Sequence, residues 1–152
     1  MDILTALILG AICGLIGAFV MNLFMRAVGR SFDRRADMVR ALGSFFTGKL
    51  ENAAAVGTAI HACAGVVFGI IYFVIMQSMG ALVFPQAIFL GLGFGFFHGL
   101  ITSYALMFYA SERHPLEDYR KATMQEGVLH LLGHMIFGLT AGVLGALISL
   151  GF

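Results

Sequence analysis

The chain has 152 residues, of which 60% are hydrophobic and only 11% charged, and its formal net charge at pH 7 is +1. This composition excludes an ordinary soluble domain and is typical of an integral membrane protein. The near-zero charge gives no basis for nucleic-acid binding. The two cysteines, Cys13 and Cys63, both fall inside apolar segments and predict no disulfide framework.

Segments without Asp, Glu, Lys or Arg occupy most of the chain, and they run over 3–25, 52–111 and 127–152. Each is long enough to cross a bilayer whose hydrocarbon core is about 30 Å thick, at about 1.5 Å per residue. The middle segment is interrupted by turn residues in QSMGALVFPQ. The sequence therefore predicts an all-α polytopic membrane protein, a four-transmembrane-helix bundle forming one transmembrane domain over residues 1–152. The predicted spans lie near 3–26, 53–77, 86–110 and 127–150.

The positive charges lie in only two places along the chain. Six of the nine lie between the first and second spans and three lie between the third and fourth. Because Lys and Arg are retained on the cytoplasmic side, loops 27–52 and 111–126 are predicted to be cytoplasmic and both termini to face outward. This interpretation assumes a bacterial-type inner membrane. The first span lacks a basic leader, so we expect it to be retained rather than cleaved as a signal peptide.

The two predicted cytoplasmic loops differ in character. The first alternates apolar and charged residues with a helical period over about 31–46, which predicts an amphipathic helix at the surface of the lipid bilayer. The second carries acids and bases in nearly equal number, and we expect a solvated connector with a short helix from about residue 117. His114 is predicted to lie on the surface of this loop.

Comparison of the sequence with itself predicts an internal repeat. At an offset of 69, HACAGVVFG (61–69) aligns with HLLGHMIFG (130–138), and at an offset of 81, LGAICGLIGA (9–18) aligns with LGLGFGFFHG (90–99). These matches predict a duplicated two-helix unit with both copies inserted in the same sense. Each span also carries a stripe of small residues, which favours close packing between helices, or with further copies or a larger membrane complex.

Four of the five histidines fall within predicted spans: His61, His98, His130 and His134. Ionisable side chains at membrane depth are costly and usually face the interior, where they mark functional sites. Counted from the cytoplasmic ends of the helices, all four fall within a layer of about 15 Å. In a four-helix bundle, these four side chains would gather at one or two sites.

Two kinds of ligand suit this histidine cluster. A b-type haem would take one axial histidine from each of two diagonal helices, His61 with His130 or His134. A bare transition-metal ion such as Fe, Cu or Zn would use His130 and His134, with His61, His98 and Glu126 completing or supporting the shell. The first hypothesis is therefore a membrane protein that binds haem b or a transition metal, for electron transfer or metal handling.

Other functions remain open at this stage. In the main alternative the protein is a non-catalytic accessory or assembly subunit, and its histidines only bond to neighbours such as Thr58, Thr102, Ser103 or Tyr104. A histidine-lined proton or ion pathway is a third reading. No nucleophile has an acid and a base in register and no phosphate-binding loop is present, so we do not expect the chain to be an enzyme on its own.

Overall fold

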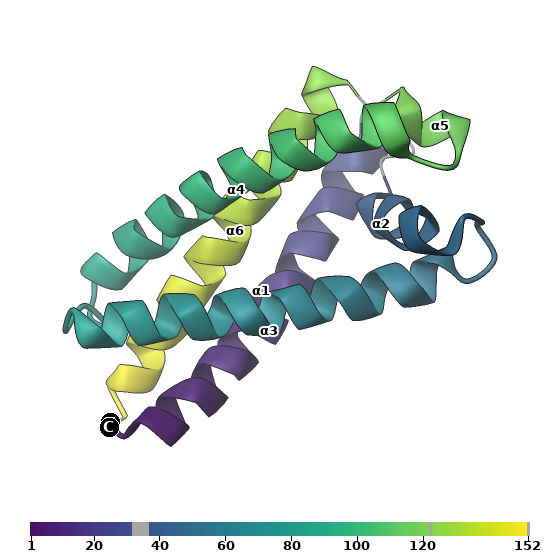
Figure 1. Cartoon of the computed structure of the whole chain (residues 1–152). Coiled ribbons are helices and arrows are strands. Elements are labelled where there is room, and N and C mark those ends of the chain that lie inside the picture. Colours follow the sequence, from purple (N-terminus) through teal and green to yellow (C-terminus); the bar gives the residue numbers. More distant parts are fainter. Residues whose placement is uncertain (32–36, 122, 152) are drawn as a thin grey trace.

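The computed structural model describes residues 1–31, 37–121 and 123–151, and all regular structure in these ranges is helical. The helices in chain order are α1 (Ile3–Ser31), α2 (Met38–Thr47), α3 (Ala53–Ser78), α4 (Gln86–Arg113), α5 (Glu117–Arg120) and α6 (Met124–Ser149) (Figure 1). Within the described residues, α1, α3, α4 and α6 are long and apolar enough to cross a membrane. This is consistent with an integral membrane protein, as the composition predicts.

The long helices pack as two close pairs, α1 with α3 and α4 with α6, which meet through α1 and α6. Glycines make both close pairs possible. A Cβ atom on Gly14 of α1 would overlap the carbonyl of Gly65 in α3, and one on Gly95 of α4 would overlap the carbonyl of His134 in α6. Any side chain at these positions would hold the backbones apart, so the predicted packing role of the glycine stripes is fulfilled within this chain.

One end of the molecule holds both ends of the described chain and the turn between α3 and α4. The Gln77 side-chain amide donates to the carbonyl of Met1 over 2.8 Å, and the Ser149 hydroxyl donates to the carbonyl of Leu82. The opposite end carries α2 and α5 (Figure 1). The two predicted cytoplasmic loops therefore lie at the same end.

Helix α2 begins and ends at identifiable caps. The carboxylate of Asp37 accepts a hydrogen bond from the backbone N–H of Arg40 at 3.1 Å, and Gly48 ends the helix with a φ of 70°. The helix begins later than the predicted 31–46, because α1 continues to Ser31; the predicted residues 32–36 lie outside the described ranges. Its apolar face packs on α3, where Cβ atoms on Gly43 or Gly57 would overlap the facing backbone.

The prediction that His114 lies on the loop surface is wrong, because its side chain is only 1% exposed. Its Nε2–H donates to the carbonyl of Ala41 in α2 at 3.0 Å, and its own carbonyl accepts from Nε of Arg120 in α5 at 2.6 Å. The ring also packs on Phe45 and Tyr119. The loop is held against α2 by a buried polar contact that its mixed charges did not reveal.

Candidate functional site

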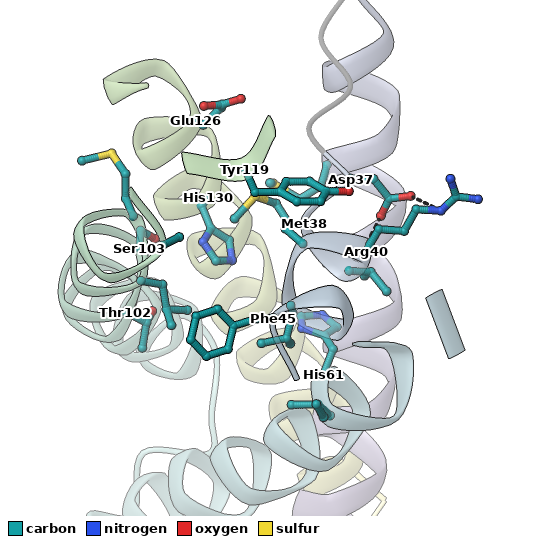
Figure 2. Close-up of a pocket in the computed structure, with 18 of the residues that line it drawn as sticks. Asp37, Met38, Arg40, Phe45, His61, Thr102, Ser103, Tyr119, Glu126 and His130 are labelled. Atoms are coloured by element: carbon teal, nitrogen blue, oxygen red, sulfur yellow. Dashed lines mark hydrogen bonds and ion pairs between the residues drawn. The ribbon is translucent and has the colours of Figure 1, made fainter. Parts of the chain in front are cut away.

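His61, His98, His130 and His134, which the sequence predicts to lie within the spans, line one cavity of about 1490 Å³. The ring centroids of His98 and His134 are 4.4 Å apart, and those of His130 and His134 are 4.9 Å apart. Figure 2 shows His130 of α6 and His61 of α3 directed into the same space, with Thr102 and Ser103 of α4 on its other side. Three long helices thus bring their histidines to one place.

Hydrogen bonds fix the proton positions on two of these rings. Nε2 of His61 lies 3.3 Å from the carbonyl of Ala18, which can only accept, so this nitrogen carries the proton. The Thr102 hydroxyl already donates to the carbonyl of His98 at 2.8 Å, and therefore accepts from Nε2–H of His134 at 3.0 Å. In the neutral rings of His61 and His134, Nδ1 is then unprotonated and keeps a free lone pair.

His98 is held by aromatic neighbours. Its Nδ1 lies 3.0 Å from the hydroxyl of Tyr72, and its ring stacks on Phe68 with centroids 3.7 Å apart. Both partners come from α3, so this contact joins α3 to α4. The hydrogen bond to Tyr72 uses Nδ1 of His98 and does not involve Nε2.

His130 differs from the other three. Its side chain is 8% exposed, and its Nδ1 atom is buried without a hydrogen-bond partner among the described residues. The hydroxyl oxygen of Ser103, 1% exposed and on the same cavity, is also unpartnered there. Buried polar atoms are nearly always satisfied, so two unpartnered atoms beside one cavity distinguish this part of the site from the ordinary helix packing around it.

The remaining lining changes along the cavity. Its inner part is apolar and includes Met21, Met25 and Phe137, while acidic and basic side chains gather toward the end that carries α2 and α5. The phenol of Tyr119 lies at this end; burial, and then the negative charge of Asp37, raise its pKa. The cavity therefore combines an apolar interior with a polar mouth.

Glu126, predicted as a metal ligand or supporting carboxylate, lies at the beginning of α6. Its carboxylate accepts the backbone N–H of Thr123 in a capping box, and Figure 2 shows it apart from the His130 ring. Across the ranges that the structure describes, no three His, Cys, Asp or Glu side chains are placed so that they could hold a metal ion together. The histidines share a cavity without forming a closed coordination shell.

Sequence reasoning placed the histidines at one depth but missed their partners in part. The hydroxyl partners expected from the sequence include Thr102 but not Tyr72, although Tyr72 is the one tyrosine between residues 52 and 78. The Ala18 carbonyl had no signal in the sequence, because any residue carries one. The cavity itself arises from how far apart helices lie, which a single sequence does not encode locally.

Comparisons with known proteins add no assignment to this geometry. No protein-family model, no characterised protein and no solved structure matches the chain. The functional argument therefore rests on the residues and their arrangement.

Proposed function

We propose that this protein binds haem b within the membrane, with His130 as an axial ligand, and serves electron transfer or metal handling. The observation that carries the proposal is a cavity of about 1490 Å³ lined by histidines from three helices, one of which, His130, has an imidazole nitrogen without a hydrogen-bond partner among the described residues. The volume lies above the range of about 300–1,000 Å³ typical of small-molecule pockets, so it does not exclude a ligand of porphyrin size.

The number of available ligands favours haem over a bare ion. A bare transition ion needs three or four protein ligands, and the described residues do not group in that way. A porphyrin supplies four nitrogen ligands itself and leaves only one or two axial positions to histidine. His61 of α3, whose Nδ1 is free, is the candidate for the second axial ligand, and His134 is the alternative to His130 on α6.

Charge favours the same ligand. Histidine and methionine are neutral ligands, and no Asp or Glu lies within the apolar segments that cross the membrane. A bare divalent ion would keep most of its charge in a medium of low dielectric constant, which costs several kcal/mol or more. Ferrous iron in a dianionic porphyrin has no net charge at the metal centre, so its burial avoids this cost.

We further propose that the fold is a four-helix bundle built from a duplicated two-helix unit, in which α1 and α3 correspond to α4 and α6. The contacts support this, because the offsets of 81 and 69 found in the sequence also relate contacts in space. The contact of Gly14 with the Gly65 carbonyl corresponds to that of Gly95 with the His134 carbonyl. A Cβ on Gly65 would lie 2.7 Å from that of Ala18, and one on Gly99 would lie 2.6 Å from that of His134. Under the same relation His61 and His130 are equivalent, as the two axial ligands of one haem would be.

The proposed location is a bacterial inner membrane, with both termini outside and the end that carries α2 and α5 in the cytoplasm. The charge distribution supports it, because all nine Lys and Arg residues lie in or next to the two loops at that end. The Phe46 side chain of α2, 66% exposed, would reach the lipid there.

The accessory-subunit alternative has one observation in its favour: three of the four histidines are hydrogen-bonded inside the protein. It leaves His130 unexplained. Its partner surface would also have to differ from the glycine stripes, since Gly10, Gly14, Gly91 and Gly95 already contact other helices of this chain.

Titration of the purified protein with hemin in mild detergent tests the proposal, together with elemental analysis for iron, copper and zinc. We expect a saturable Soret band at one equivalent that is lost in His130→Leu. Stoichiometric copper or zinc without a Soret band would show that the ligand is a bare ion and not haem. If the protein binds neither haem nor a metal ion, the accessory-subunit function would be favoured.

A further inference from the structure

The cavity is open on one side of the molecule, between α3 and α4. These helices meet near the turn that joins them and diverge toward the end that carries α2 (Figure 1), and they make few contacts with each other. Ala64 of α3 and Leu106 of α4 both line the cavity and are both exposed. Because these residues belong to apolar helices, the opening would face the hydrocarbon of the bilayer.

The opposite side of the molecule is closed by equivalent residues. In the proposed internal repeat, the offset of 81 makes Met25 of α1 equivalent to Leu106 of α4. The offset of 69 makes Ala64 of α3 equivalent to Gly133 of α6. Met25 and Gly133 touch: the Met25 Sδ lies 2.9 Å from where a Cβ on Gly133 would be. Ala64 and Leu106 instead border the cavity. The α3–α4 side is thus an open counterpart of the packed α1–α6 side.

One contact of the closed side is already present on the open side. In the closed interface the Phe137 ring packs on Gly17, where a Cβ would lie 3.0 Å from the ring. The equivalent pair is Phe68 and His98, whose rings stack with centroids 3.7 Å apart. Helices α3 and α4 are therefore already aligned as α6 and α1 are. The wider part of the gap between α3 and α4 begins beyond the stacked rings of Phe68 and His98.

Helices α2 and α5 lie across the end of the cavity that would face the cytoplasm. Helix α2 is fixed to α3 through the close approach of Gly43 to Gly57, and to the end of α4 through the bond from His114 to the Ala41 carbonyl. Phe45 and Tyr119 add aromatic contacts on His114 at this end. A ligand dissolved in the bilayer would reach the apolar part of the cavity between α3 and α4 without passing the charged side chains and aromatic contacts at this end.

We propose that the gap between α3 and α4 is a lateral portal through which a planar, membrane-dissolved metalloporphyrin enters from the bilayer, and that the gap then narrows toward the α1–α6 arrangement. The proposal rests on the proposed haem function for the identity of the ligand. The narrowing rests on the internal equivalence alone.

A cysteine pair across the portal tests both parts. Ala64→Cys and Leu106→Cys are combined in a Cys13→Ala, Cys63→Ala background, reconstituted in vesicles and oxidised with diamide. The single variants in the same background are the matched controls, and circular dichroism verifies folding. We expect a disulfide only in the double variant, because Ala64 and Leu106 come together only when the gap narrows.

Hemin uptake from preloaded vesicles gives the second readout. The disulfide-linked protein should take up hemin at least about tenfold more slowly than the single variants, and reduction should restore the rate. Protein linked after loading should keep its Soret band. Equal uptake with and without the disulfide would overturn the portal, and no disulfide formation would overturn the narrowing. If the unlinked variants bind no hemin, the proposed haem function fails and the portal with it, whereas the disulfide still decides whether the gap narrows.

Discussion

Replacing His130 by leucine separates a ligand-binding role from a packing role, because the two predict opposite effects on stability. The imidazole is 8% exposed and its Nδ1 has no partner among the described residues. A buried polar group without a hydrogen bond costs about 1–3 kcal/mol. Leucine has a similar size and no polar atom. In ligand-free protein, His130→Leu should therefore raise the free energy of unfolding by about 1–3 kcal/mol.

The matched control is His134→Leu, one turn further along the same helix. The His134 Nε2–H donates to the Thr102 hydroxyl at 3.0 Å, so this change removes a hydrogen bond and leaves an acceptor unsatisfied. It should lower the free energy of unfolding by about 0.5–1.5 kcal/mol. Both variants are measured by denaturant unfolding in the same detergent.

For His130→Leu, the expected effect on hemin binding is opposite to its expected effect on stability. His130→Leu should weaken hemin binding more than about tenfold while stabilising the ligand-free protein. That combination is typical of a residue kept for function rather than for stability. If His130→Leu destabilises the protein as His134→Leu does, and hemin binding is unchanged, His130 is a packing residue and the reasoning is refuted.

Three further predictions follow from contacts outside the histidine cluster. Gly95→Ala should lower the free energy of unfolding by about 1–3 kcal/mol, because the added methyl group would overlap the His134 carbonyl. Its control, Gly93→Ala, has open space around the new methyl group and should raise the free energy of unfolding by up to about 1 kcal/mol. Equal effects of the two substitutions in denaturant unfolding would contradict the close packing of α4 on α6. His114→Ala removes the bond from α2 to the end of α4 and should speed limited proteolysis between α1 and α3, while unchanged cleavage would show that α2 is held by α3 alone. In an alkaline titration followed by ultraviolet absorbance, Tyr119→Phe should remove a phenol that ionises above the usual tyrosine range, because burial and Asp37 raise its pKa; loss of a phenol of ordinary pKa would refute this.

The long helices could be predicted from the sequence because length and apolarity alone decide them. The exclusion of charge from 52–111, with turn residues near its middle, is enough to separate α3 from α4. The helix ends on the side of α2 and α5 were less predictable: α1 runs to Ser31, past Arg26 and Arg30. Helical backbone does not have to stop where the hydrocarbon stops, so the apolar pattern underestimates helix length at the interface.

The site was predictable in position and not in detail. Depth counting brought His61, His98, His130 and His134 together because a helix has a fixed rise per residue. It gave no means of telling His130, which is unpartnered, from His134, which bonds to Thr102. That difference depends on which faces of α4 and α6 meet, and this is set by the glycine contacts between them. The burial of His114 was missed for a similar reason, since its partner Ala41 lies 73 positions away.

The most direct test of haem binding is an absorption spectrum of the protein purified in mild detergent from cells that make haem. We predict a Soret band whose visible bands sharpen on reduction with dithionite, and the loss of this spectrum in His130→Leu at unchanged yield. A folded, monodisperse protein with no Soret band, before or after incubation with hemin, would contradict the proposed function.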